Sequence, residues 1–352
     1  MKRPSFRFWL SLTTLLLVAV LLYLSRHQLD HAWHLVREAN LWLLVLIIPL
    51  IVAGNIVAGE MTLSYLRQKR LIQHISAWEL MRVSMEFNFV NHVLPSGGMS
   101  GVSYLNWRLS KLGVAGTQST VAQAVRFVTG FAAITTLLVV SVLAVTIDSG
   151  INRWIILMSS AMVFLMFIAT LGVIYLVSSP VRMQRFAGWL ATACNKLVRW
   201  ATRGRKKAVI DSQRLMVMFN DMHRDYVSMM RDKKILLRPY LWGMLFYALD
   251  VAQFYIAFLA LGVYVNPAAI LIGYGIAQLA AFVVVTPGGA GAYEALMVLV
   301  LATTGLSEGR AIAGIILARV IILHIVIGLG YIFYQRALIT YDKRDSESIG
   351  DN

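Results

Sequence analysis

Ionisable side chains stand inside several long apolar stretches of this sequence. A charge buried among apolar residues is costly unless it is paired, so each of these residues is a candidate for function. The best candidates among them are Arg126 and Arg319, because a guanidinium stays charged and can bind phosphate through two parallel hydrogen bonds. We predict that both bind an anionic headgroup. The carboxylates that would balance these charges or carry a proton are Glu60, Glu86, Asp250 and Glu294.

Buried ion pairs that only hold helices together are the alternative for each of these residues taken singly. A binding function is favoured more strongly for Arg126 and Arg319, because these two arginines occupy nearly equivalent positions in a weak sequence repeat.

Two similar sequences interrupt the apolar segments 77–110 and 268–304: "LPSGGMSG" from residue 94 and "TPGGAGAYE" from residue 286. Proline ends an incoming helix, and glycine permits a sharp reversal of the chain. The helix that follows begins with unpaired N–H groups at the positive end of its dipole, which suit a phosphate or carboxylate. The glycines predicted to present these groups to a headgroup are Gly97, Gly98, Gly288, Gly289 and Gly291.

The two interruptions belong to a weak internal repeat. When Pro95 is aligned with Pro287, glycine pairs follow both prolines, and Arg126 and Arg319 stand 31 and 32 positions further on. Two similar units of opposite orientation are typical of transporters that bind their substrate near the bilayer midplane. Each arm of a broken segment has about 18 residues and is roughly 27 Å long. The turns could therefore lie at mid-membrane or at the far interface.

Composition supports a membrane location. Hydrophobic residues make up 59% of the 352 residues and charged residues only 14%, whereas soluble domains are about half apolar and a quarter charged. Stretches of about 20 apolar residues, enough to cross a bilayer, lie near 8–24, 41–66, 117–147, 154–177, 240–263 and 310–338. We predict an all-α integral membrane protein with six full transmembrane helices and two broken re-entrant hairpins, eight or more membrane segments in total.

Basic residues predict the orientation. Lys and Arg gather in segments that would face one side, while the opposite loops near 148–153 and 263–267 are short and nearly uncharged. Cytoplasmic loops carry the excess of Lys and Arg, so both termini should be cytoplasmic. Within one polytopic membrane domain, 1–352, we expect a basic amphipathic helical insertion at 178–238 and a polar tail at 339–352. The insertion suits the anionic leaflet or, as the less favoured alternative, a specific partner.

Other kinds of site have little support. The single cysteine, Cys194, excludes an intrachain disulfide framework and a cysteine-rich metal site. His27, His31 and His34 share a helical face, but histidines at such spacing are common and no cysteine supports a zinc site. No P-loop, H-E-x-x-H or G-x-S-x-G motif occurs. We expect no metal, no cofactor, no catalytic residue and, because membrane spans flank the basic "RGRKKA" at 203–208, no nucleic-acid partner.

Three stretches together resemble the transmembrane region of the lysylphosphatidylglycerol synthase family: "LPSGGMSGVSYLNWRLSKLGV" from residue 94, "TPGGAGAYEALMVLVL" from 286 and "IILARVI" from 315. The most specific piece is P-G-G-x-G-x-x-E at 287–294, and Arg319 also matches. The resemblance implies a helical fold with re-entrant elements in the bacterial cytoplasmic (inner) membrane. It also implies the movement of lipids, such as aminoacylated phosphatidylglycerol or glycolipid intermediates, between leaflets. Only a short tail follows Leu338, so aminoacylation of lipid is not expected.

We therefore predict a flippase that moves an anionic phospholipid or a lipid-linked intermediate through a polar cleft between the two broken helices. Its partners would be membrane lipids and, as a further option, a cytoplasmic lipid-modifying enzyme. One alternative is a membrane-embedded enzyme with Glu86, His92 or Glu294 as acid or base. Another is a scaffold that recruits a cytoplasmic enzyme through 178–238.

Overall fold

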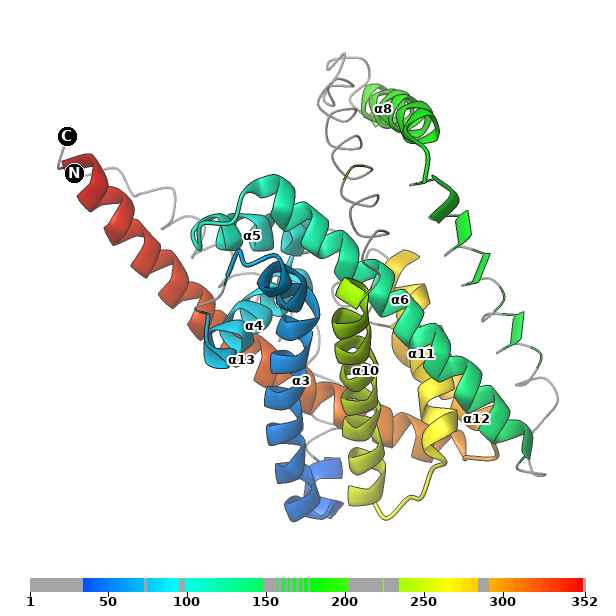
Figure 1. Ribbon diagram of the computed structural model, residues 1–352. Coiled ribbons are helices and arrows are strands. Elements are labelled where there is room, and N and C mark those ends of the chain that lie inside the picture. Colours follow the sequence, from blue (N-terminus) through cyan, green and yellow to red (C-terminus); the bar gives the residue numbers. More distant parts are fainter. Residues whose placement is uncertain are drawn as a thin grey trace.

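The computed structural model describes residues 34–72, 75–94, 99–147, 157, 160–161, 164, 167–168, 171–172, 174–176, 178–201, 224, 234–283 and 291–350. Every regular element in these ranges is an α-helix, as the sequence predicted (Figure 1). The labelled helices are α3 (Leu41–Gln68), α4 (Ala77–Val93), α5 (Met99–Ser110), α6 (Gly116–Ile147), α8 (Pro180–Ala201), α10 (Lys234–Ala260), α11 (Pro267–Val283), α12 (Ala292–Thr303) and α13 (Glu308–Gly350).

Four helices in the described ranges are long and apolar enough to cross a membrane: α3, α6, α10 and α13. They coincide with four of the six predicted spans. Many of their exposed side chains are large and apolar, and Trp42, Val140 and Leu143 each expose more than half of their surface. The predicted span 8–24 lies outside the described residues, and 154–177 is described only at scattered helical positions.

The two broken segments each form a pair of helices. α4 and α5 are separated by residues 94–98, and α11 and α12 by residues 284–291. α12 follows Gly291, whose φ of +90° is a conformation that glycine adopts without strain. Residues 95–98 and 284–290, which include Gly97, Gly98, Gly288 and Gly289, lie outside the described residues. The depth of the two turns therefore stays a prediction.

Helices α3–α6 and α10–α13 have matching packing patterns. α3 packs against its counterpart α10; α6 packs against α11 as α13 packs against α4, and α6 packs against α10 as α13 packs against α3. In Figure 1, α3 runs upward and α10 runs downward. The described part of the chain thus contains two four-helix units of opposite orientation, as in transporters with inverted repeats. Each unit includes one helix more than the sequence repeat indicated.

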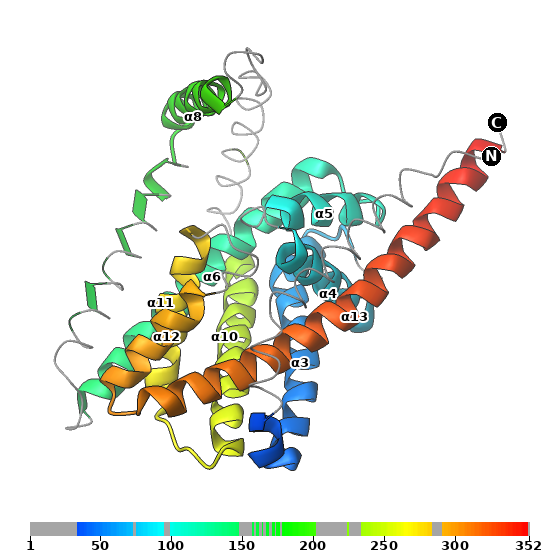
Figure 2. The same ribbon diagram turned by 180° about the vertical axis from the view of Figure 1, so that it is seen from behind.

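Glycines allow the two units to interlock closely. α13 runs diagonally across α4 (Figure 2), and a Cβ added at Gly330 of α13 would lie 2.7 Å from the carbonyl oxygen of Met85. At the corresponding contact between α11 and α6, a Cβ at Gly275 would lie 2.9 Å from a methyl of Leu138. Small residues at such contacts let membrane helices approach each other. These contacts fix the first helix of each broken segment beside the other unit.

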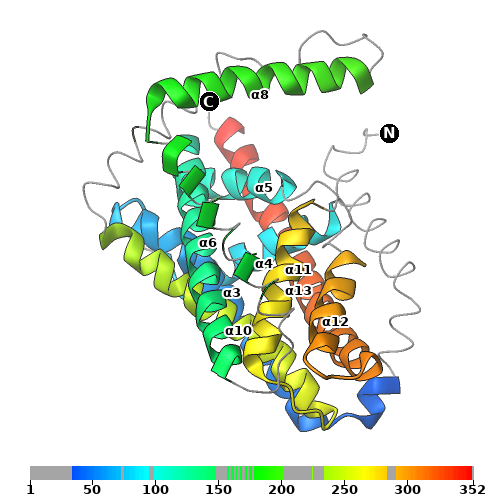
Figure 3. The same ribbon diagram turned by 90° about the vertical axis from the view of Figure 1, so that its right-hand side faces the viewer.

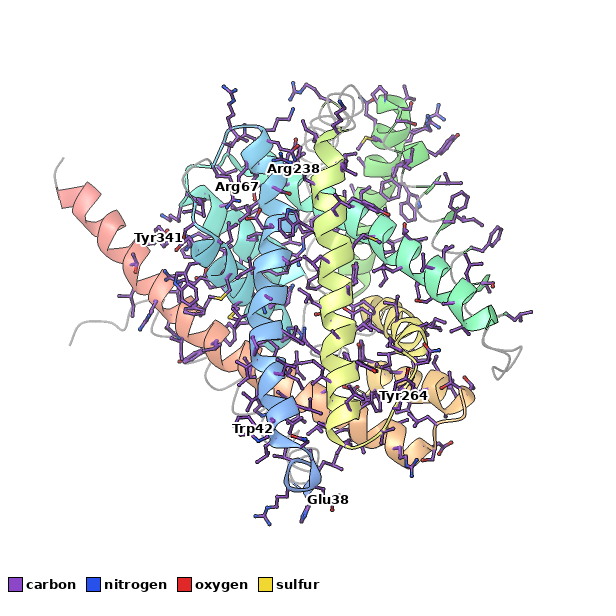
Figure 4. All side chains as sticks on the ribbon, turned by 60° about the horizontal axis from the view of Figure 1, so that its bottom comes forward. Glu38, Trp42, Arg67, Arg238, Tyr264 and Tyr341 are labelled. Carbon is purple, nitrogen blue, oxygen red and sulfur yellow. The ribbon has the colours of Figure 1, made fainter. Side chains whose placement is uncertain are left out.

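The two ends of the bundle differ in charge. Figure 4 shows Arg67 of α3 and Arg238 of α10 at one end and Glu38, Trp42 and Tyr264 at the other. The basic end is the one where α3 finishes and α10 begins. This distribution follows the asymmetry that the sequence indicated, and it places the outer groove described below at the basic end.

Helix α8 belongs to the basic insertion predicted at 178–238, and it lies crosswise to the bundle beyond its basic end (Figure 3). Met183, Ala187 and Ala191 recur at helical spacing and are buried, whereas Trp189 is 63% exposed. The helix therefore has one buried face, as an amphipathic helix does. Its association with a lipid surface stays a prediction.

Candidate functional site

A polar cavity of about 170 Å³ lies inside the bundle, and both four-helix units line it. Asn55, one of its wall residues, stands near the midpoint of the 28-residue α3. The cavity thus lies at the depth where transporters with inverted repeats bind their substrates. Its polar side chains come from six helices: Asn55 (α3), Asn88 and His92 (α4), Asp250 and Gln253 (α10), Tyr274 and Gln278 (α11), Tyr293 (α12) and Arg319 (α13).

The first unit contributes neutral groups to the cavity. The Asn88 side-chain amide donates to Asn55 Oδ1 at 2.9 Å, and the Asn55 amide in turn donates to the carbonyl oxygen of Ile51 at 2.9 Å. His92 follows Asn88 by four residues, so both point to the same face of α4, and its Nδ1 lies 2.7 Å from the Asn88 carbonyl oxygen. These bonds orient the amides and join α3 to α4.

The second unit contributes an ion pair at the start of α12. Arg319 Nε lies 3.0 Å from Glu294 Oε1, and their side chains are 13% and 18% exposed. Glu294 Oε2 also accepts the N–H of Gly291 at 2.7 Å, and the Arg319 guanidinium lies 4.2 Å from the centre of the Tyr293 ring. The carboxylate therefore stands where the helix N-terminus and the arginine would otherwise hold a bound anion.

Asp250 is the second carboxylate of the second unit. Its Oδ2 accepts the Tyr274 hydroxyl at 2.7 Å, and its Oδ1 accepts the Gln253 amide at 3.3 Å. In the part of the chain that the structure describes, it makes no ion pair. The cavity wall thus holds an arginine with a carboxylate partner and a carboxylate that only neutral donors contact.

Arg126 does not line the cavity. Its guanidinium lies 4.6 Å from the centre of the Phe87 ring, and it makes no ion pair with any described residue. Tyr247 of α10, which does not line the cavity either, interacts electrostatically with both Arg126 and Asp250. The two predicted headgroup arginines therefore occupy different surroundings.

Comparison with known proteins identifies the family of this chain. The model of the lysylphosphatidylglycerol synthase TM region matches residues 8–330. The chain belongs to that family. A relative described as a UPF0104 membrane protein, from Methanothermobacter thermautotrophicus, is 21% identical over 243 residues, which is 68% of this chain and 70% of that protein. The resemblance stated from the sequence is confirmed, and this member of the synthase transmembrane family is a membrane protein.

Glu86 lies outside the cavity of this family member, in a buried network at the basic end. Its Oε2 accepts the Tyr104 hydroxyl at 2.9 Å and Arg108 Nε at 3.0 Å. Arg108 also donates to the Tyr341 hydroxyl at 2.7 Å and forms an ion pair with Glu79. Glu86 and Arg108 are 0% and 1% exposed. The network therefore joins α4, α5 and the far end of α13.

Glu60 also lies outside the cavity. Its carboxylate forms an ion pair with Arg67 at 2.6 Å, two helical turns further along α3. Glu60 and Glu86 thus neutralise arginines at the basic end of the molecule, whereas Glu294 pairs with one of the two predicted headgroup arginines.

Sequence reasoning overlooked the neutral wall of the cavity. Asn55, Asn88 and Gln253 stand in apolar helices, and a search for buried amides as well as buried charges would have found them. Gln278 had a signal in the repeat, because it stands nine positions before Pro287, as Glu86 stands nine positions before Pro95. Of the glycines predicted to present N–H groups, only Gly291 lies among the described residues. No cluster of potential metal ligands occurs in the described ranges.

Proposed function

We propose that this protein is a lipid flippase that moves an anionic phospholipid or a lipid-linked intermediate between leaflets. The polar cavity that both inverted units line at mid-membrane carries the proposal. A space of about 170 Å³ has room for a headgroup, but sites that enclose a whole ligand are larger, about 300–1,000 Å³. The headgroup would therefore cross through the protein while the acyl chains stay in the bilayer.

Anion exchange at Arg319 is the proposed binding step. A headgroup phosphate would displace the Glu294 carboxylate and take over its two partners, the guanidinium and the N–H of Gly291. Glu294 would return when the headgroup leaves, so that the arginine is never left without an anion in a low-dielectric site. Asp250, which no described cation neutralises, would accept hydrogen bonds from headgroup hydroxyls.

Alternation between the leaflets would use the repeat. In transporters with inverted repeats, the two units rock against each other around a fixed site, and a ligand shifts the equilibrium only by binding the two states differently. Arg126 would approach the headgroup in the state opposite to the one described here. This step gives a role to an arginine that no described carboxylate neutralises.

The membrane arrangement is part of the proposal. We infer six full spans and two re-entrant hairpins, with both termini and α8 on the cytoplasmic side of the bacterial inner membrane. The basic end that carries Arg67 and Arg238 supports this orientation. A transporter, in contrast to an enzyme, also agrees with a family match to the TM region of the synthases.

Headgroup translocation in proteoliposomes tests the proposal. The assay would use labelled phosphatidylglycerol, phosphatidylcholine and a polyprenyl phosphate, and compare the unaltered protein with Arg319→Ala and Glu294→Gln. We expect selective movement of an anionic lipid and its loss in both variants. Arg310→Gln is the matched control, because Arg310 is exposed in the first turn of α13 and does not line the cavity.

Two results would contradict the proposal. One is a panel in which no lipid moves faster than in empty liposomes. The other is equal movement in the unaltered protein, Arg319→Ala and Glu294→Gln, which would place the route elsewhere.

A further inference from the structure

A second hollow lies on the outside of the α3–α10 pair, and we name it the outer groove. It measures about 460 Å³ and is lined by Glu60, Ser64 and Arg67 of α3 and by Arg238, Leu241, Trp242 and Leu245 of α10. Consecutive helical residues are turned by about 100°. Glu60 and Arg67 therefore stand about 140° and 120° around α3 from Asn55, which lines the polar cavity, and the two hollows share no lining residue. The outer groove is a separate site.

One end of the outer groove carries a net positive charge. Arg67 is neutralised by Glu60 at 2.6 Å and also donates to the carbonyl oxygen of Ile75 at 2.9 Å. Arg238 is exposed and makes no ion pair with any described residue. Two guanidinium groups against one carboxylate leave a charge of about +1, which an anionic group would balance.

On the α10 side, the groove beyond Arg238 is apolar and lies toward the membrane interior. Arg238, Leu241, Trp242 and Leu245 recur at i, i+3, i+4 and i+7, so they form one stripe along α10. Leu241 and Leu245 are 55% and 43% exposed. Tryptophan suits the boundary between headgroups and acyl chains because its ring is amphipathic. The order charge, tryptophan, leucine follows the order of a phospholipid from its phosphate to its acyl chain.

The groove is also held in shape at its charged end. The side-chain amide of Gln68, at the end of α3, donates to the carbonyl oxygen of Ile235 of α10 at 3.0 Å. The two helices that form the groove are therefore tied together beside Arg238, so its width is fixed before any ligand arrives.

We propose that the outer groove binds one anionic phospholipid from the leaflet at the basic end of the bundle. Its phosphate would contact Arg238, and an acyl chain would lie along Leu241 and Leu245. The proposal does not rest on the flippase function, because a lipid could occupy this groove in a protein that transports nothing.

Quenching of Trp242 by brominated lipids tests the outer groove. The protein is reconstituted in vesicles containing brominated phosphatidylglycerol or brominated phosphatidylcholine, and the Trp242 signal is the difference between the unaltered protein and Trp242→Phe. We expect half-quenching at about a fivefold lower mole fraction of phosphatidylglycerol, as one basic contact predicts. Trp42, measured in the same way with Trp42→Phe, lies at the opposite end and should show no preference.

Variants test whether the charged end of the groove causes the preference for phosphatidylglycerol. Arg238→Gln should remove it, Arg238→Lys should keep most of it, and Glu60→Gln should increase it by freeing Arg67. Arg310→Gln removes the same charge at the opposite end and should leave the preference unchanged. The groove proposal is wrong if both lipids quench Trp242 equally in the unaltered protein, or if the preference survives in Arg238→Gln. If the preference is present but no lipid is translocated, only the flippase proposal fails.

Discussion

The two four-helix units share a scaffold but hold their central carboxylates differently. In the first unit, Glu86 pairs with Arg108 at 0% and 1% exposure. In the second unit, Glu294 pairs with Arg319 at 18% and 13% exposure, beside an open cavity. A pair without access to a ligand can only hold helices together, whereas a pair at a cavity can exchange its anion. The comparison indicates a structural ion pair in the first unit and an ion pair with access to a cavity in the second.

The arginines that follow the broken segments sharpen this contrast. Arg126 lies over the Phe87 ring at 4.6 Å and Arg319 over the Tyr293 ring at 4.2 Å, each ring belonging to the preceding broken segment. Only Arg319 has a carboxylate partner among the described residues. Both units thus place an arginine over an aromatic ring, on the first helix of the broken segment in one unit and on the second helix in the other, but only the second unit places a described carboxylate beside the arginine.

The largest effect is expected from breaking the buried pair of the first unit. Glu86→Ala would leave Arg108 without its most buried partner, and removal of one member of a buried pair costs about 3–5 kcal/mol. Thermal unfolding in detergent, followed by tryptophan fluorescence, would measure the loss. Glu294→Ala should cost clearly less, because its partner stands beside a cavity.

A double variant checks that interpretation. Glu86→Gln combined with Arg108→Met removes both charges and should recover much of the stability that either single change loses. If the stability losses of the two single variants simply add in the double variant, the Glu86–Arg108 pair is not the cause of those losses. If Glu294→Ala destabilises as much as Glu86→Ala, the contrast between the units fails.

Substitutions of the two members of the second pair should have opposite effects on the affinity for a phosphate headgroup. Arg319→Ala removes charge-assisted hydrogen bonds worth about 1.5–3 kcal/mol, so affinity for glycerol phosphate should fall roughly tenfold or more. Glu294→Gln removes the internal competitor and should raise that affinity, although it blocks the reset that transport needs. Titration calorimetry of the purified protein measures both. A fall in affinity in both variants would mean that the pair is only structural.

Much of the fold was predictable because its causes are local. Apolar length located α3, α6, α10 and α13. The sequences Pro-Ser-Gly-Gly and Pro-Gly-Gly located the interruptions between α4 and α5 and between α11 and α12. Each of these features depends on a short stretch of chain. The positions of the helix breaks therefore followed from sequence, whereas the depth of the turns depends on packing.

The partners of the buried charges were not predictable. In the sequence, Arg108 is a basic residue that flanks a membrane segment. In the structure, α5 folds back on α4 and buries Arg108 against Glu86. Tyr341 joins the same network from more than two hundred positions away. The repeat aligns Arg126 with Arg319, but only Arg319 reaches the cavity. Sequence located the charges, and long-range packing decided which of them meet.

Gly330 should reveal how firmly the units interlock. A Cβ in Gly330→Ala would lie 2.7 Å from the carbonyl oxygen of Met85, which is backbone and cannot turn away. We expect destabilisation by about 1–3 kcal/mol, the usual cost of overpacking. In Gly275→Ala the nearest atom belongs to the flexible Leu138 side chain at 2.9 Å, so the loss should be smaller. Equal losses in thermal unfolding would show that the two contacts are equally rigid.

The smallest effect is expected at the neutral wall that the first unit contributes. Asn88→Ala removes the hydrogen bond to Asn55, and such bonds between membrane helices average about 0.6 kcal/mol. Stability should therefore fall slightly, and headgroup translocation should fall roughly threefold, because the amides orient a ligand that Arg319 binds. Asn88→Asp tests the same position with a charge and should repel an anionic headgroup at little change in volume. If Asn88→Ala abolishes transport as completely as Arg319→Ala, the first unit contributes more than positioning, and the division of roles between the units is wrong.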